Sequence, residues 1–165
     1  MLDLGKELYK DVWVIFDLDG TLANIKERRD LSTGEDGKMD WDKFFNPTNI
    51  KLDKPHQKII TLLVLLKNVG FNIAILSGRS ESTKKETEKW LVKYNIPYNL
   101  LKMRPTSTKW KFIPDDELKQ YWLEELFPNE DAKEKLFMVF DDRDKVVKMW
   151  RENNIKCLQV ASGNF

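Results

Sequence analysis

The sequence predicts an α/β fold of the Rossmann-like, three-layer kind, in which helices cover both faces of a central parallel sheet. Three observations support this. Short apolar runs alternate with longer amphipathic segments along the 165 residues, which is typical of strand-helix-strand units. The runs are almost wholly apolar, as expected of strands buried on both faces. Charged or small polar residues follow several of them, where the ligands of such sheets bind.

Five strands and four helices are expected. The strands are Val12 to Phe16, Asn72 to Leu76, Asn99 to Lys102, Leu136 to Phe140 and Lys156 to Val160. The helices are Pro55 to Val69, Glu81 to Tyr94, Asp115 to Phe127 and Arg143 to Asn153. The length suits one domain, residues 1–165.

Local signals support the helix boundaries. Pro55 suits a first helical turn, with Asp53 or Lys54 near the cap, and Gly70 suits the end of the same helix. Ser80 is a suitable cap for the next helix. Pro114 is followed by three acidic residues, whose charge complements the dipole of a helix that begins there.

Residues 22–53 interrupt the alternation. A connection of this length inside a compact domain is usually functional or flexible, and this one directly follows a pair of aspartates. We expect a small cap or lid, with an ordinary insertion as the alternative. Phe44 and Phe45 are expected to pack in the core, whereas Trp41 suits either the core or a contact with the substrate.

The first strand ends in the most informative motif, Asp17-Leu18-Asp19-Gly20-Thr21. Side chains two apart in a strand point the same way, so Asp17 and Asp19 converge. Such a pair of like charges persists mainly where a metal or a shared proton relieves the repulsion. A carboxylate is also a possible nucleophile, and the Thr21 hydroxyl suits a phosphate. Taken alone, the motif also fits an ordinary Asp-Gly turn.

Two other strand ends carry polar residues. Ser77-Gly78-Arg79 follows the second strand, and a hydroxyl, a small residue and a guanidinium suit a phosphate. Asp141-Asp142-Arg143 follows the fourth strand and adds oxygen ligands suited to Mg²⁺. Each fits a turn or a helix cap when taken singly. Their coincidence at one edge of a parallel sheet favours a phosphate and metal site.

Together, these motifs resemble the haloacid dehalogenase (HAD) superfamily of phosphotransferases. Lys102-Met103-Arg104-Pro105, the run from Phe140 to Arg151 and the ending from Cys157 to Phe165 are similar to the phosphatase domain of bacteriophage polynucleotide kinase-phosphatases. The resemblance implies a HAD core with a small cap insertion over 22–53. It also implies Asp17 as nucleophile, Asp19 as general acid/base and Lys119 as the motif-three lysine, with Lys109 or Lys111 as substitutes. The implied Mg²⁺ ligands are Asp17, Asp19, Asp141 and Asp142, and the implied phosphate-binding residues are Thr21, Ser77, Gly78, Arg79, Arg104 and Arg143.

The resemblance implies a Mg²⁺-dependent phosphomonoesterase that forms an aspartyl-phosphate, with the 3′-phosphate of a polynucleotide end as substrate. A nucleotidase or other small-metabolite phosphatase is the first alternative, and a non-catalytic HAD-fold binding module is the second. The sequence has no G-x-x-x-x-G-K-[ST] motif to cradle a nucleoside triphosphate, so we expect no kinase activity.

The composition limits the other classes of protein. A net charge of +1 gives no general attraction to nucleic acid. The longest apolar stretch, Ile59 to Leu66, is shorter than the roughly 20 residues of a membrane span, so no membrane partner is expected. A single cysteine, Cys157, and no signal-peptide pattern favour the cytoplasm.

Overall fold

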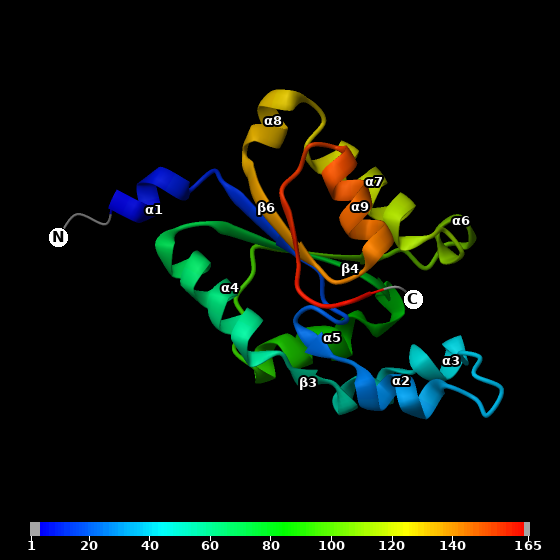
Figure 1. The fold of residues 1–165 in the computed structure, drawn as a ribbon. Coiled ribbons are helices and arrows are strands. Elements are labelled where there is room, and N and C mark those ends of the chain that lie inside the picture. The colour runs from blue at the N-terminus through cyan, green and yellow to red at the C-terminus, as the bar shows by residue number, and fades with distance from the viewer. Residues whose placement is uncertain (1–3, 164–165) are drawn as a thin grey trace.

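The computed structural model describes residues 4–163 and is built on a parallel sheet (Figure 1). Its five strands are β1 (Trp13–Phe16), β4 (Asn72–Ser80), β5 (Leu100–Arg104), β6 (Leu136–Asp141) and β7 (Cys157–Gln159). They lie in the order β5-β4-β1-β6-β7, and all four pairings are parallel. The predicted α/β fold is confirmed, and the first strand of the sequence is the central strand of the sheet.

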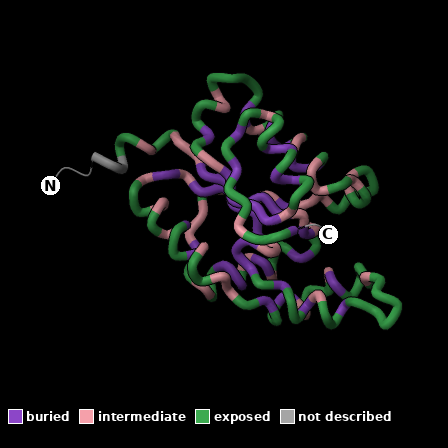
Figure 2. Tube along the Cα trace, in the orientation of Figure 1, coloured by how far each residue is buried: buried purple, intermediate pink, exposed green. Residues whose placement is uncertain are grey.

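Helices cover both faces of this sheet. The long ones are α4 (Gln57–Val69), α5 (Lys84–Lys93), α7 (Asp115–Leu126) and α9 (Asp144–Glu152). Because neighbouring strand residues point to opposite faces, Val14 and Phe16 pack in the cluster that includes α4 and α5 residues, while Ile15 packs with residues of α7 and α9. Figure 2 shows the buried residues concentrated on the strands between these two helical layers.

The structure differs from the prediction at some boundaries and adds short elements. β4 continues to Ser80, α4 begins after His56 rather than at Pro55, and α5 begins at Lys84. The added elements are α1 (Leu4–Tyr9), α6 (Thr108–Lys111), α8 (Glu130–Glu134) and the 3-10 helix Glu81–Thr83. These pieces have at most six residues, so their hydrophobic periodicity is too short to predict.

Residues 22–53 leave and return through one small antiparallel ribbon, in which β2 (Ala23–Asn24) pairs with β3 (Lys54–Pro55). Between these strands lie α2 (Lys26–Ser32), α3 (Trp41–Phe44) and the 3-10 helix Pro47–Leu52. Phe44 is buried and Phe45 packs against the same core cluster, as predicted, whereas Trp41 is exposed. Pro55 therefore belongs to the ribbon and not to a helix.

Within residues 4–163, every helix falls short of the length and apolar character needed to cross a bilayer.

Candidate functional site

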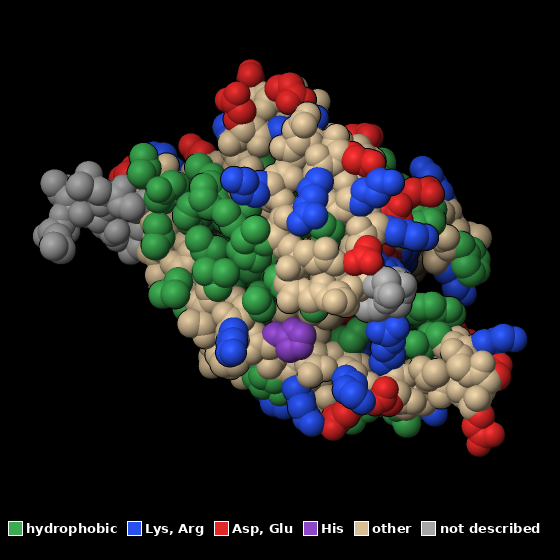
Figure 3. Space-filling view, in the orientation of Figure 1, with side chains coloured by type: hydrophobic (Ala, Val, Ile, Leu, Met, Phe, Trp, Pro, Cys, Tyr) green, Lys and Arg blue, Asp and Glu red, His purple; other side chains and the backbone are tan. Residues whose placement is uncertain are grey.

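A cavity of about 1000 Å³ lies where β1, β4 and β6 end, between the sheet and the 22–53 segment. Asp17, Asp19, Arg79, Asp141 and Asp142 all line it. Figure 3 shows a hollow on this side of the molecule, between the arm formed by α2 and α3 and the body above it. The three motifs predicted to share one edge of the sheet therefore do so.

The floor of the cavity holds a buried acidic group. One carboxylate oxygen from each of Asp17, Asp141 and Asp142 lies within 4.8 Å of the others. The Lys119 ammonium of α7 reaches two of them: Nζ lies 2.6 Å from Asp17 Oδ1 and 2.8 Å from Asp141 Oδ2. Lys119 is thus the lysine that joins the acidic group, while Lys111 lies elsewhere on the cavity wall and Lys109 is not part of its lining.

Burial and neighbouring charge disfavour the ionised forms of Asp17 and Asp142. Burial, together with Asp141 and Asp142, raises the pKa of Asp17 against the opposing effect of Lys119. Burial and the neighbouring Asp141 also raise the pKa of Asp142 to about 6. Burial would lower the pKa of Lys119, but Asp141 and Asp17 outweigh it and raise that pKa, so the amine stays charged. A group of three carboxylates with one ammonium suits a further cation.

Gly20 allows Asp142 to approach the first strand end. Its φ is +91°, and a Cβ built there would lie 2.1 Å from Asp142 Oδ2. The hydroxyl of Thr21 lies 3.4 Å from Asp142 Oδ1 and is fully buried. The structure therefore places Thr21 against a carboxylate of the acidic group and outside the cavity lining.

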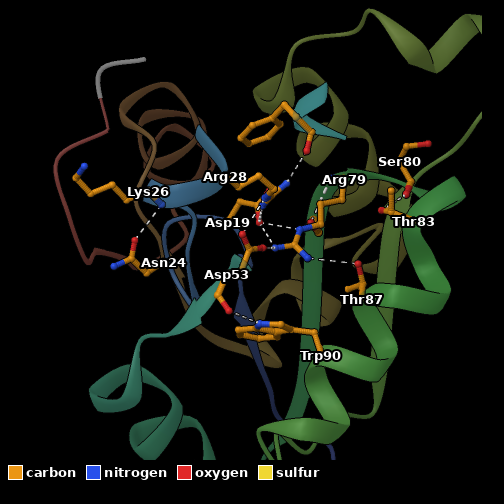
Figure 4. A network of polar contacts seen from close by, with 12 residues as sticks. Asp19, Asn24, Lys26, Arg28, Asp53, Arg79, Ser80, Thr83, Thr87 and Trp90 are labelled. Carbon is orange, nitrogen blue, oxygen red and sulfur yellow. Dashed lines mark hydrogen bonds and ion pairs between the residues drawn. The ribbon is translucent and has the colours of Figure 1, made fainter. Parts of the chain in front are cut away.

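Asp19 faces two arginines (Figure 4) and is not one of the three carboxylates grouped on the cavity floor. Its Oδ1 accepts hydrogen bonds from Arg28 Nη2 at 2.8 Å and from Arg79 Nε at 2.7 Å, and Arg79 Nη2 also contacts it. Burial would raise the pKa of Asp19, but Arg79 and Arg28 outweigh it and lower the pKa to about 2. The two aspartates of the motif therefore have different partners: Asp17 contacts Lys119, and Asp19 contacts Arg28 and Arg79.

Asp53 ties the same two arginines together from the end of the 22–53 segment. Its carboxylate accepts from Arg28 Nε at 2.8 Å and from Arg79 Nη2 at 2.6 Å, and all three side chains are buried. The Asp53 carbonyl also accepts from the Trp90 indole at 2.9 Å. The local sequence indicated Asp53 only as a residue near a helix cap and gave no signal for Arg28, because their pairing spans 25 positions.

An irregularity in β4 sets the position of Arg79. The pairing of β4 with β5 shifts register between Ser77 and Ser80, and such a bulge re-aims the side chains beside it. A Cβ on Gly78 would lie 2.6 Å from Asp115 Oδ1, so any side chain at this position would displace the Asp115 carboxylate. The Ser77 hydroxyl is buried and accepts from the Arg79 backbone N–H at 3.2 Å; it lies behind the cavity lining.

Asp115 joins the other two predicted arginines. Arg104 Nη2 contacts Asp115 Oδ1, Arg143 Nη1 contacts Asp115 Oδ2, and both arginines line the cavity. Arg104 also donates to the carbonyls of Trp110 and Ile113 at 2.6 and 2.7 Å. The local sequence indicates Asp115 only as part of an acidic helix start. Its contacts with Arg104 and Arg143 join different elements of the fold, so the local pattern could not predict them.

The arrangement agrees with comparisons to known proteins. A family model described as the phosphatase domain of polynucleotide kinase PNKP matches residues 11–165. The chain belongs to this family. It is a HAD-type phosphatase domain, and the predicted resemblance is confirmed.

Two further similarities are informative about this PNKP-type domain. The "Putative bifunctional polynucleotide kinase/RNA ligase" of Autographa californica nuclear polyhedrosis virus is 34% identical over 147 residues, which cover 86% of this chain and 18% of the viral protein. A chain in the structure of the Pnkp1/Rnl/Hen1 RNA repair complex is 34% identical, with a TM-score of 0.68 over 92% of this chain and 43% of that one. The PNKP-type domain thus spans less than half of either relative.

A more distant structure supports the fold alone. A predicted phosphatase from Clostridium acetobutylicum has a TM-score of 0.67 at 17% identity, covering 90% of this chain and 83% of that one.

Proposed function

We propose that this domain is a Mg²⁺-dependent phosphomonoesterase that removes the 3′-phosphate from polynucleotide ends through an aspartyl-phosphate. The observation that carries the proposal is the placement of Asp17 at the cavity floor, beside two further carboxylates and a charged lysine, with guanidinium groups on the walls. The name of the matched family and the RNA repair complex that contains a similar chain support a nucleic-acid end as substrate.

In the proposed first step, an Asp17 carboxylate oxygen attacks phosphorus in line, and the bond between phosphorus and the ester oxygen breaks. Asp19 donates a proton to the departing alkoxide. In the second step, water attacks the phosphorus of the aspartyl-phosphate, Asp19 takes its proton, and Asp17 is released with inorganic phosphate. Arg28 and Arg79 keep Asp19 ionised in the free protein, so a phosphate that engages Arg79 would remove one of the groups that oppose protonation.

The donor set fits Mg²⁺. Three buried carboxylates supply the hard oxygen ligands that this ion prefers. Burial and the neighbouring carboxylates raise the pKa values of Asp17 and Asp142, and a bound cation would oppose this shift. Asp17, Asp141 and Asp142 would hold the ion. Bound there, it would offset repulsion between the phosphate and Asp17 and stabilise charge on the equatorial oxygens.

Lys119 and the arginines supply the remaining positive charge. We propose that Lys119 orients the attacking Asp17 carboxylate and that Arg79 binds the transferring phosphate. Arg104 and Arg143 would bind phosphate oxygens farther out, with Asp115 fixing both side chains. Thr21, Ser77 and Gly78 would act mainly by positioning Asp142 and Arg79, and backbone N–H groups nearby would complete phosphate binding.

We further propose that residues 1–165 form a single domain that works in the cytoplasm and itself has no kinase activity. Within this domain, residues 22–53 would form a small cap over the site. The cap is supported by its ribbon stem and by Arg28 and Asp53, which come from opposite ends of the segment and meet at Arg79.

The decisive experiment compares a 3′-phosphorylated oligonucleotide with free mononucleotides at matched concentration, with and without Mg²⁺. We expect a higher kcat/KM for the oligonucleotide and a fall in rate with salt, because the backbone phosphates of the oligonucleotide bind by displacing counterions. Preferential turnover of mononucleotides would favour a nucleotidase. No Mg²⁺-dependent turnover of any phosphomonoester would favour a binding module.

A further inference from the structure

We propose that Trp41 and Phe112 form a subsite for the base of the 3′-terminal nucleotide, and that this base is unpaired when it binds. The inference rests on the function proposed above and specifies the substrate of the same site. It concerns the mouth of the cavity, beyond the residues that act on phosphate.

Both rings are exposed although they are large and apolar. Trp41 is 55% exposed and Phe112 is 79% exposed, and both line the cavity. The other strongly exposed aromatic rings among residues 7–163, Tyr121 and Phe137, lie away from it. Covering an exposed aromatic ring with a flat ligand removes apolar surface from water, which is favourable. Two such rings at one cavity therefore indicate a binding surface.

The two rings come from separate additions to the core. Trp41 begins α3 in the 22–53 segment, and Phe112 directly follows α6, between β5 and α7. Figure 1 shows α3 and α6 projecting from the same side of the molecule, and Figure 3 shows the hollow between these two regions. Exposed aromatic rings therefore border the cavity on both sides, Trp41 from the 22–53 segment and Phe112 from the body.

The Trp41 ring is held in place from below. It stacks on Phe45 with a centroid distance of 5.8 Å and an interplanar angle of 18°, and it meets Phe44 edge-on at 5.8 Å. Phe44 in turn lies under the Arg28 guanidinium at 4.3 Å. Arg28 also donates a hydrogen bond to Asp19. A continuous set of contacts therefore connects the Trp41 ring to the proposed acid/base residue.

Charge and size also favour a nucleotide. Lys111 lines the cavity with its ammonium 5.5 Å from the Phe112 ring centre, so a cation for a backbone phosphate lies beside the ring. The cavity volume of about 1000 Å³ is at the upper end for small-molecule sites and far exceeds a phosphate group. The space between the acidic group and the rings is thus available to a sugar and a base.

Stacking on aromatic rings accepts any base, because every base presents a flat face. A base inside a duplex has those faces covered by its neighbours and must unstack before it can bind here. The subsite therefore favours single-stranded or overhanging 3′ ends without selecting their sequence.

The test measures kcat/KM for a single-stranded 3′-phosphorylated oligonucleotide, for the same strand with an abasic 3′-terminal residue, and for the strand in a blunt duplex. The proteins are the wild type, Trp41→Ala, Phe112→Ala and Trp41→Phe, with Phe137→Ala as a control that truncates an exposed ring outside the cavity. Glycerol phosphate, which has no base, reports phosphate chemistry alone.

We expect each alanine variant to lower the ratio of kcat/KM on the base-bearing strand to that on the abasic strand by roughly 5- to 150-fold, mostly through KM. Trp41→Phe should retain most of the ratio, and the wild type should prefer the single strand to the blunt duplex. Equal ratios for the wild type and both alanine variants would overturn the base subsite. No turnover of the oligonucleotide by a wild type that hydrolyses glycerol phosphate would instead overturn the proposed function.

Discussion

Replacing Lys119 with methionine tests how the acidic group is held together. The Lys119 side chain is buried and its ammonium contacts Asp17 at 2.6 Å and Asp141 at 2.8 Å. Methionine keeps much of the volume and removes the charge, leaving three carboxylates within 4.8 Å of one another without their ammonium partner. Breaking a buried ion pair by removing one partner costs about 3–5 kcal/mol.

For a chain of 165 residues, each kcal/mol lowers the unfolding temperature by about 2–4 °C. We therefore expect Lys119→Met to unfold at a temperature about 6–20 °C lower than the wild type in metal-free buffer, as measured by differential scanning calorimetry. Added Mg²⁺ should restore part of this loss, because a bound cation replaces some of the missing charge, while turnover stays low.

The matched control is Lys109→Met. Lys109 is exposed and lies over the Trp110 ring on α6, so its replacement should change stability by no more than about 0.5 kcal/mol. An unchanged unfolding temperature for Lys119→Met in metal-free buffer would refute the reasoning. Full turnover by Lys119→Met together with its loss in Lys111→Met would assign the lysine role to Lys111.

Four further predictions address the other groups. Asp17→Asn should abolish turnover while keeping the circular dichroism spectrum of the wild type, because asparagine is a poor nucleophile of the same size; substantial residual turnover would exclude Asp17 as nucleophile. Asp19→Asn should impair hydrolysis of an alkyl phosphate far more than that of p-nitrophenyl phosphate, whose leaving group needs no proton; equal losses on both substrates would argue against an acid. Asp53→Asn should lower the free energy of unfolding in urea by about 3 kcal/mol, since it leaves two buried guanidinium groups without a carboxylate that they share. The control Asp30→Asn breaks an exposed pair with Lys26 and should cost under about 0.5 kcal/mol. Similar losses in both variants would disprove the role of burial. Mg²⁺ at about 100 times its Kd should stabilise the wild type by about 2.7 kcal/mol, and Asp142→Asn should shrink this gain; equal gains in both proteins would place the ion elsewhere.

The sheet and the main site motifs could be predicted because they depend on local sequence. Val12 to Phe16 is a continuous apolar run, and a run of that kind forms a buried strand in almost any α/β context. Once the strands are parallel, their carboxyl ends meet at one edge, so Asp17, Arg79 and Asp141 had to lie near one another. This geometric rule needs no knowledge of individual contacts.

The partners of the charged side chains could not be predicted in this way. Lys119 and Asp17 are 102 positions apart, and Arg79 and Asp53 are 26 positions apart. The helical spacing of Lys119 is equally typical of a solvated surface lysine, and the acidic turn at Asp115 is equally typical of a helix start. Only the depth at which α7 packs decides that both side chains enter the site.

By itself, the sequence determined the α/β fold, the strands that end at the site and the family of phosphatase domains to which the chain belongs. Tertiary structure alone decided that Lys119 rather than Lys109 or Lys111 contacts the acidic group, that Arg28 and Asp53 join Arg79 at Asp19, and that Trp41 and Phe112 border one cavity. The physical reason is that hydrophobic periodicity acts over a few residues and fixes each element. Ion pairs and ring contacts join elements far apart in the chain, and they form only after the layers have packed.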